Sequence, residues 1–354
     1  MTPTTCGRSS TFSIWVSGAT EPVASSVLVT GGTGFIGSSL VRALVDRGDR
    51  VRVLDNNLRG SADRLEGYLS RIEYRQGDVT DYQTVEDATR GMEVVYHLAY
   101  INGTENFYSF PEKVLKVAVK GAINTLDAAM SCGVRRYVVT SSSEVYNEPT
   151  RIPTPEDERL VVPDVLNPRF SYGGGKIITE LLAIHYTGKT SLETVICRPH
   201  NVYGPDMGVG HVIPQLVLRL RDLAETSTDE VLEFPILGTG DETRAFCYVL
   251  DATDAILRAA DHGEHRGIYH VGTEEEVSIR SVAEAIARHR GIPIRIVSSE
   301  APSGAPSRRC PSIQKMRSLG YEPKWPLERG LGETVDWYID SGLSLPASEQ
   351  VIAR

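Results

Sequence analysis

This sequence of 354 residues lacks any apolar run long enough to cross a membrane. The short FSIWV patch near its start is too weak for the hydrophobic core of a signal peptide. Its five cysteines are an odd number without a CxxC pair, a pattern that argues against a disulfide framework and against a zinc site. We therefore expect a cytoplasmic protein with no membrane partner and no bound metal.

Positive charge is also sparse, because 37 Lys and Arg residues are outnumbered by 46 Asp and Glu, giving a formal net charge of −9. No Lys/Arg-rich patch is present, so a nucleic-acid partner has no electrostatic support. The 41% hydrophobic and 23% charged composition is that of an ordinary globular protein and excludes fibrous and disordered classes. A phosphate-bearing substrate would have to be held by local basic groups.

From residue 27 onward, strand-like and helix-like patterns alternate. Strands are predicted at 27–30, 51–55, 72–79, 94–100 and 137–143, with helices at 38–48, 84–92 and 114–133. After a Pro- and acid-rich interruption at 148–168, a helix is expected from 171 and a strand from 194. This alternation predicts an α/β fold of the Rossmann type, with right-handed βαβ units in a doubly wound parallel sheet.

After residue 204 the pattern becomes mixed. Helices are predicted at 211–224, 251–260 and 281–291, and the segment 234–249 is typical of a β-hairpin. We expect this part of the chain to form a smaller C-terminal α/β lobe around the end of the sheet. Residues 1–25 are interpreted as a flexible extension and 341–354 as a tail.

The glycine-rich segment from Gly31 to Gly37 (GGTGFIG) lies directly between a predicted strand and a predicted helix. Backbone N–H groups at such a helix N-terminus can cradle a pyrophosphate, and a side chain larger than glycine would block its approach. Asp55 ends the next strand, where its carboxylate can accept hydrogen bonds from ribose hydroxyls and repel a 2′-phosphate. Together the two features predict an NAD site.

Tyr172 and Lys176 are four residues apart on a predicted helix, so their side chains share one face. A free tyrosine is a poor base at neutral pH because its pKa is about 10. A neighbouring ammonium and the positive nicotinamide ring would stabilise its phenolate. The hydroxyl-rich run from Thr140 to Tyr146 follows a predicted strand, at the edge where open α/β sheets bind ligands.

Taken together, these motifs resemble the extended short-chain dehydrogenase/reductases that act on nucleotide sugars: epimerases, dehydratases and decarboxylases. The resemblance spans roughly residues 27–338. It implies that residues 26–204 mainly form the NAD-binding domain with the catalytic groups, and that 205–340 mainly form the nucleotide-sugar lobe. The cofactor residues that it implies are Gly31, Gly34, Phe35, Ile36, Gly37, Asp55, Asn56, Asp78, Val79, Leu98, Ala99, Tyr172, Lys176 and Pro199.

The same resemblance implies a catalytic triad of Ser142, Tyr172 and Lys176. In this family's chemistry Tyr172 would take the proton of the sugar 4-hydroxyl, and Ser142 would hydrogen-bond the same oxygen. Lys176 would lower the pKa of Tyr172 and hold the nicotinamide ribose, while hydride passes from C4 to NAD. The residues implied for substrate binding are Ser143, Asn201, Val212, Arg244, Arg308 and Arg309.

Three positions depart from the family pattern. Tyr100 stands where an alanine is usual, Ala118 where an asparagine often contacts the cofactor, and Asn147 where a glycine usually follows Val-Tyr. The implied partner is a nucleotide-diphosphate sugar, with UDP the most common nucleotide. A homodimer is implied as well, with helices 84–92 and 114–130 as its interface.

All three family reactions begin with oxidation at C4, so the triad does not separate them. The sequences of residues 167–176 and 198–214 resemble most those of sugar 4-epimerases. They favour a 4-epimerase that works through a transient 4-keto sugar. A 4,6-dehydratase usually has an Asp-Glu pair, of which only Glu144 is present, after Ser143. A uronic-acid decarboxylase would use Glu144 with carboxylate-binding arginines such as Arg169 and Arg309. A non-catalytic NAD-binding regulator is a more distant alternative.

Overall fold

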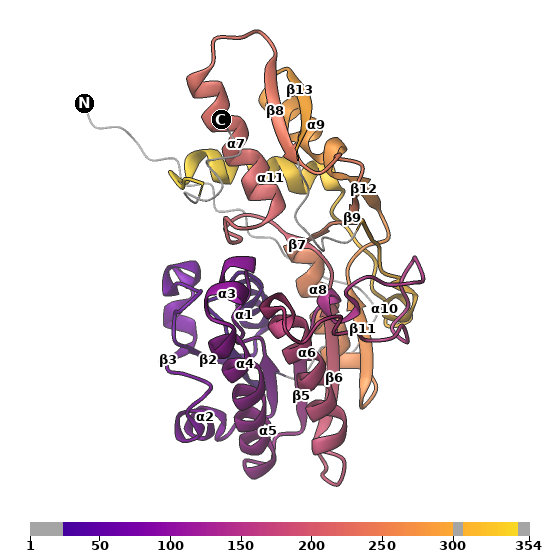
Figure 1. Ribbon diagram of the computed structural model, residues 1–354. Helices are drawn as coiled ribbons and strands as arrows, with labels where there is room; N and C mark the ends of the chain where they lie inside the picture. The colour runs from indigo at the N-terminus through magenta and orange to yellow at the C-terminus, as the bar shows by residue number, and fades with distance from the viewer. Residues whose placement is uncertain (1–23, 300–306, 346–354) are drawn as a thin grey trace, which may run out of the picture.

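The computed structural model describes residues 24–299 and 307–345, so nearly all of the predicted extension and part of the predicted tail lie outside it. Figure 1 shows a lower part built on the central sheet and an upper, smaller lobe. Among the residues described, no helix is long and apolar enough to cross a membrane.

The central sheet has seven strands, all parallel, in the order β11-β6-β5-β4-β1-β2-β3. This confirms the predicted doubly wound α/β fold. The strands are β1 (Ser26–Thr30), β2 (Arg50–Asp55), β3 (Glu73–Gln76), β4 (Val94–His97), β5 (Arg136–Thr140), β6 (Glu193–Pro199) and β11 (Gly267–Val271). Strand β11 follows several elements of the upper lobe in the sequence, and it forms one edge of this sheet.

Helices cover both faces of this sheet. On one face α1 (Phe35–Arg47) packs beside α8 (Val249–His262), where the hydroxyls of Ser39 and Thr253 lie 2.8 Å apart. The other face buries apolar side chains of α2 (Tyr82–Thr89), α5 (Ala122–Ser131) and the turn that follows α6 (Ser171–Leu181). The short α3 (Thr104–Ser109), followed by α4 (Pro111–Lys116), leads into α5.

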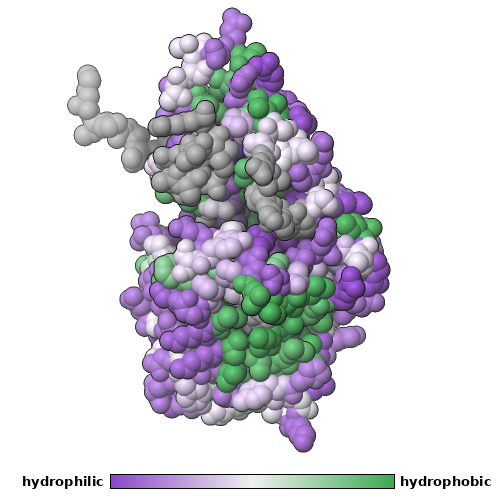
Figure 2. Space-filling model, viewed as in Figure 1, coloured by the Kyte–Doolittle hydropathy of each residue, from purple (hydrophilic) through white to green (hydrophobic). Residues whose placement is uncertain are grey.

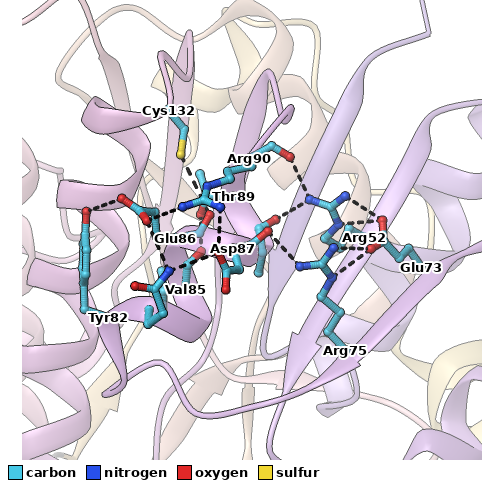
Figure 3. A network of polar contacts seen from close by, with 12 residues as sticks. Arg52, Glu73, Arg75, Tyr82, Val85, Glu86, Asp87, Thr89, Arg90 and Cys132 are labelled. Carbon is cyan, nitrogen blue, oxygen red and sulfur yellow. Dashed lines mark hydrogen bonds and ion pairs between the residues drawn. The ribbon is translucent and has the colours of Figure 1, made fainter.

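A polar network ties α2 to the edge of the sheet (Figure 3). Arg52 on β2 binds Glu73 on β3 and donates hydrogen bonds to the carbonyls of Ala88 and Arg90 at 2.8 and 2.9 Å. Arg75 reaches the carbonyl of Asp87 in the same way, at 2.8 Å. The last carbonyls of a helix have no partner within the helix, and these guanidinium groups supply one.

The upper lobe corrects one prediction, because residues 234–249 do not form a hairpin. Strand β8 (Leu232–Leu237) pairs in parallel with β13 (Ile294–Ser299). Strand β9 (Thr243–Ala245) lies instead between β12 (Glu276–Ser278) and β14 (Arg308–Arg309). The carboxylate of Glu242 accepts the N–H groups of Thr239 and Gly240, which folds the connection into a compact turn between two separate sheets.

The remaining elements complete the lobe and its junction with the sheet. Helices α7, α9 and α11 enclose a second apolar core with β8 (Figure 1). The other elements are α7 (Val212–Thr226), α9 (Ile279–Arg290), α10 (Gln314–Arg317), α11 (Leu327–Asp340), β7 (Val202–Tyr203) and β10 (Cys247–Tyr248). The short β7 and β10 pair where the chain passes between the two parts.

Candidate active site

The glycine-rich turn is as close-packed as the sequence predicts. A Cβ atom on Gly37 would lie 2.0 Å from the carbonyl oxygen of Gly31, and one on Gly31 would lie 2.5 Å from the backbone nitrogen of Ala99. Gly31 also has a φ of +76°, which glycine adopts without strain. Helix α1 then begins without a side-chain cap, so its first N–H groups are available to a phosphate.

A cavity of about 90 Å³ opens beside this turn. Eight of the fourteen predicted cofactor residues line it: Gly31, Gly34, Asp55, Asn56, Asp78, Val79, Leu98 and Ala99. Phe35 and Ile36 do not, because both pack against the apolar cores. Gly37, Tyr172, Lys176 and Pro199 lie outside its lining as well.

Asp55 is fixed at the mouth of this cavity. One of its carboxylate oxygens accepts the N–H of Thr33 at 3.0 Å, and the other accepts that of Asn57 at 2.9 Å. Asn56 donates to Asp78 at 3.0 Å, which brings a second carboxylate to the same place. The residues present therefore fit a dinucleotide with free ribose hydroxyls and disfavour one that carries a 2′-phosphate.

Arg59 is a cavity residue that the sequence reasoning missed. Its side chain lines the same space as Asp55, and burial together with the nearby Arg64 lowers the pKa of its guanidinium. A single arginine in a loop belongs to no recognised motif, and its place four residues after Asp55 was the only signal. It brings positive charge to a cavity whose other charged groups are carboxylates.

The structure brings the predicted triad together at the end of β5. Ser142 caps the short turn that follows this strand and hydrogen-bonds Tyr172, which is 8% exposed at the start of α6. Lys176, one helical turn further, is 3% exposed and donates to the carbonyl of Thr140 at 2.6 Å. Its ammonium nitrogen lies 5.8 Å from the ring centroid of Tyr172.

Burial has the largest effect on the pKa values of Tyr172 and Lys176. Burial raises the pKa of Tyr172 above its usual value, and the Ser142 hydrogen bond offsets only part of that rise. Burial also lowers the pKa of Lys176 to about 7, although Glu180 opposes this shift. Among the protein's own groups, desolvation therefore outweighs the favourable contacts of the phenolate, and the lowering of the tyrosine pKa by Lys176 and the nicotinamide ring stays a prediction.

The departure at Tyr100 shapes this site. The rings of Tyr100 and Phe107 pack on that of Tyr172, with centroids 5.1 and 4.9 Å away. A Cβ on Gly175 would lie 2.3 Å from the Tyr100 hydroxyl and 2.8 Å from the Cβ of Ala118. The larger side chain at 100 is thus matched by small residues at 118 and 175, so two of the departures form one packing arrangement.

Next to the triad, an ion pair joins Glu144 to Arg309. Burial alone would raise the pKa of Glu144, but Arg309, then Arg169 and Arg244, outweigh it and lower the pKa. Burial and the neighbouring Arg309 lower the pKa of Arg244 to about 10. Arg309, in contact with Glu144, and the charges of Arg169 and Arg244 therefore give this place beside Ser142 and Tyr172 an excess of positive charge, which can attract an additional anion.

The other residues predicted to bind the substrate differ in their burial and in their contacts. Ser143 is buried one residue from Ser142, and Asn201 donates to the carbonyl of Ala245 at 3.2 Å. Val212 is half exposed at the first residue of α7. Arg308 turns outward and pairs with Glu276 at 2.7 Å, so its implied role in substrate binding stays a prediction.

Comparison with known proteins agrees with this site. Residues 27–272 match the family model described as the NAD-dependent epimerase/dehydratase family. The chain is 33% identical to the low-salt glycan biosynthesis protein Agl12 of Haloferax volcanii, over 88% of this chain and 98% of that protein. It is 34% identical to UDP-glucuronic acid decarboxylase 5 of Arabidopsis thaliana, over 86% of each chain.

Solved structures show the same architecture. The UDP-glucose 4-epimerase of Thermotoga maritima, solved with UDP-glucose, superposes with a TM-score of 0.79 at 26% identity, over 89% of this chain and 99% of that one. Because the family model covers most of the chain and the relatives exceed 30% identity over nearly their full lengths, the chain belongs to the NAD-dependent epimerase/dehydratase family.

Proposed function

We propose that this protein decarboxylates a nucleotide-linked uronic acid, with NAD as its cofactor, by way of a 4-keto sugar. The observation that carries the proposal is the Glu144–Arg309 pair, with Arg244 and Arg169 around it, beside Ser142 and Tyr172. A neutral hydroxymethyl group at C5 would form no ion pair with such a cluster, whereas a carboxylate at that position would pair with arginine.

The cofactor would be held by the chain's own groups in a simple way. The N–H groups of the Gly31–Gly37 turn would take the pyrophosphate, Asp55 the adenosine ribose, and Lys176 the nicotinamide ribose. When bound, NAD supplies the hydride acceptor for C4. Tyr172 accepts the proton of the 4-hydroxyl, and Ser142 holds the oxygen from which that proton leaves.

The 4-keto uronic acid is a β-keto acid, which explains the second step. The electron pair of the C5–C6 bond moves toward the C4 carbonyl as carbon dioxide leaves, and the resulting enolate takes a proton from water at C5. The hydride removed in the first step then returns to C4 while Tyr172 gives its proton back to the C4 oxygen, so the cofactor ends as NAD and the net change is the loss of carbon dioxide. Ser142 and the protonated Tyr172 donate hydrogen bonds to the enolate oxygen, where the negative charge develops. Arg309 and Arg244 hold the carboxylate until the bond breaks.

Epimerisation at C4 is a second candidate. The sequence around residues 167–176 and 198–214 favours it, and the Thermotoga maritima epimerase has the same fold. A 4-epimerase needs the ketone and room for the sugar to turn, and it makes no use of a charged group at C5. The arginine cluster therefore ranks it second.

Incubation with UDP-glucuronic acid, UDP-glucose and UDP-N-acetylglucosamine, followed by proton NMR and mass spectrometry, separates these reactions. We expect loss of carbon dioxide from UDP-glucuronic acid and no change in the other two sugars. An isobaric product with an inverted C4 signal would establish the epimerase instead, and loss of water would establish a dehydratase.

We also infer a homodimer whose interface includes the start of the predicted segment 114–130, on α4, together with α6. Figure 2 shows an apolar patch on the face of the lower part. Figure 1 places α4 and α6 on this face, and their exposed apolar side chains are Leu115, Ile178 and Leu181. Helix α2, the other helix that was predicted to share the interface, packs one face against α5 within the chain, and its part in an interface stays a prediction.

A further inference from the structure

A second, smaller cavity lies behind the Glu144–Arg309 pair. Its volume is about 10 Å³, and it shares no lining residue with the cofactor cavity. Ser143, Thr154, His200 and Arg309 are among the side chains that line it. A cavity of roughly 10–15 Å³ is large enough for one water molecule when polar groups surround it.

Two of these side chains carry polar atoms that need a partner. His200 is 2% exposed, and neither of its ring nitrogens hydrogen-bonds any residue that the structure describes. Arg309 is 8% exposed, and its Nε–H is equally without a partner among those residues, although its Nη1 binds Glu144. Buried polar groups in native proteins nearly always have a partner, and an ordered water often supplies it.

The orientation of His200 is fixed by its neighbours. Its ring packs edge-on against that of His270, with centroids 4.6 Å apart. His270 is itself held by the Tyr146 hydroxyl at 2.6 Å and the carbonyl of Ser312 at 2.9 Å. Burial, with His270, Arg309 and Arg198 nearby, lowers the pKa of His200 well below its usual value. A neutral imidazole offers one donor and one acceptor.

We propose that this cavity binds one ordered water, which accepts the Nε–H of Arg309 and donates to the imidazole of His200. His200 is then a positioning residue: through the water it holds the Arg309 guanidinium in the orientation that pairs with Glu144. The water site stands on the cavity and its polar lining, and only the kinetic consequence below rests on the proposed decarboxylation.

The direct test is a high-resolution crystal structure of the full chain and of two variants. We expect a water within hydrogen-bonding distance of Arg309 Nε and a ring nitrogen of His200. In His200→Phe the water should be lost and the side chain of Arg309 should turn away from Glu144. In His200→Gln, which keeps a donor and an acceptor, both should be retained. A dry cavity in the parent chain, or an unchanged Arg309 in His200→Phe, would overturn the proposal.

The kinetic test uses UDP-glucuronic acid and the same variants. Because small displacements of a positioned group cost about a hundredfold in rate, we expect kcat to fall roughly tenfold to a hundredfold in His200→Phe, and KM to rise because Arg309 also holds the substrate carboxylate. His200→Gln should recover most of the loss. The exposed His262, on the last turn of α8, gives a matched control in His262→Phe, which should behave as the parent chain.

These measurements separate the two proposals. Equal losses of kcat in the Phe and Gln variants, with unchanged thermal midpoints, would contradict the positioning role. Absence of any turnover of UDP-glucuronic acid by the parent chain would remove the proposed function, while the crystal structures would still decide the water site and its hold on Arg309.

Discussion

Tyr172 lies in surroundings that favour its neutral form, since burial raises its pKa and the Glu144 carboxylate raises it further. Its hydroxyl can act as a base only where positive charge compensates, and Lys176 is the nearest candidate on its own helix. Replacement by phenylalanine removes the proton acceptor and leaves the packing with Tyr100 and Phe107 possible.

We therefore expect Tyr172→Phe to lower kcat by about 10²- to 10⁴-fold, with the thermal midpoint and NAD affinity close to those of the parent chain. Steady-state turnover of the sugar nucleotide, with NAD binding followed by calorimetry, measures both. Tyr82→Phe, on exposed α2, is the matched control. Turnover near the parental rate would exclude Tyr172 as the base.

Lys176 illustrates the cost of a buried cation. Its pKa falls from the ordinary 10.5 to about 7 in the folded protein, so the unfolded chain binds more protons between these pH values. Stability contributed at this site therefore rises with pH from about 7 to about 10.5, and the full penalty is present below pH 7.

On this basis Lys176→Met should increase the free energy of unfolding at pH 6, by about 1–4 kcal/mol, while abolishing turnover. The gain should shrink as the pH rises toward 10. Urea titrations of both proteins at several pH values test this directly. A variant less stable than the parent chain at pH 6 would show that the contacts with Thr140 and Tyr100 outweigh desolvation.

Single residues also show which parts of the site could be predicted from the sequence and which could not. Asp55 was predictable because the position after a second strand has a fixed relation to the glycine turn. Arg309 was linked to Glu144 only through the family resemblance, because it lies 165 residues away and only the fold brings the two together. His200 had no signal at all, since an unpartnered buried imidazole is defined by what surrounds it.

At the scale of elements, the strand–turn–helix of β1 and α1 allows little variation in sequence. Gly37→Ala would place a Cβ 2.0 Å from the Gly31 carbonyl oxygen, and a contact that close forces the turn to open. We expect NAD affinity to fall at least about tenfold, because a displacement of the turn misaligns the helix N-terminus with the pyrophosphate.

Gly210→Ala is the control for this change, because nothing lies within 4 Å of a Cβ there and its φ is not in the left-handed region. Fluorescence titration with NAD compares the two variants with the parent chain. Equal affinity in Gly37→Ala would mean that the pyrophosphate does not rest on this turn.

Local patterns predicted the elements better than they predicted pairing. The alternation of strands and helices up to β6 predicted the parallel sheet, because βαβ units of this spacing nearly always form right-handed crossovers between parallel strands. The segment 234–249 misled, because two short strands around a Gly-Thr-Gly turn are typical of a hairpin. Their true partners, β13 and β12 with β14, are distant in sequence and could not be read from the turn.

For the whole molecule, the apolar patch on α4 and α6 leads to a prediction about assembly. Ile178 and Leu181 are 38% and 51% exposed, and both lie on α6 near its end. Light scattering after gel filtration should give twice the chain mass for the parent protein. Ile178→Glu with Leu181→Glu should give the monomer, because buried charges without partners destabilise an interface.

A pair of glutamates on an exposed apolar site of the lobe, Val231→Glu with Val297→Glu, is the control for surface charge and should leave the dimer intact. A monomeric parent protein at micromolar concentration would contradict the homodimer, and a dimeric α6 variant would move its interface elsewhere.

The position of β11 along the chain has a consequence for the evolution of this protein. Strand β11 and helix α8 follow segments of the upper lobe in the sequence but belong to the lower part. Neither part is therefore one contiguous stretch of the chain. A genetic exchange that replaced residues 205–340 in one piece would therefore also remove an edge strand and a covering helix of the central sheet.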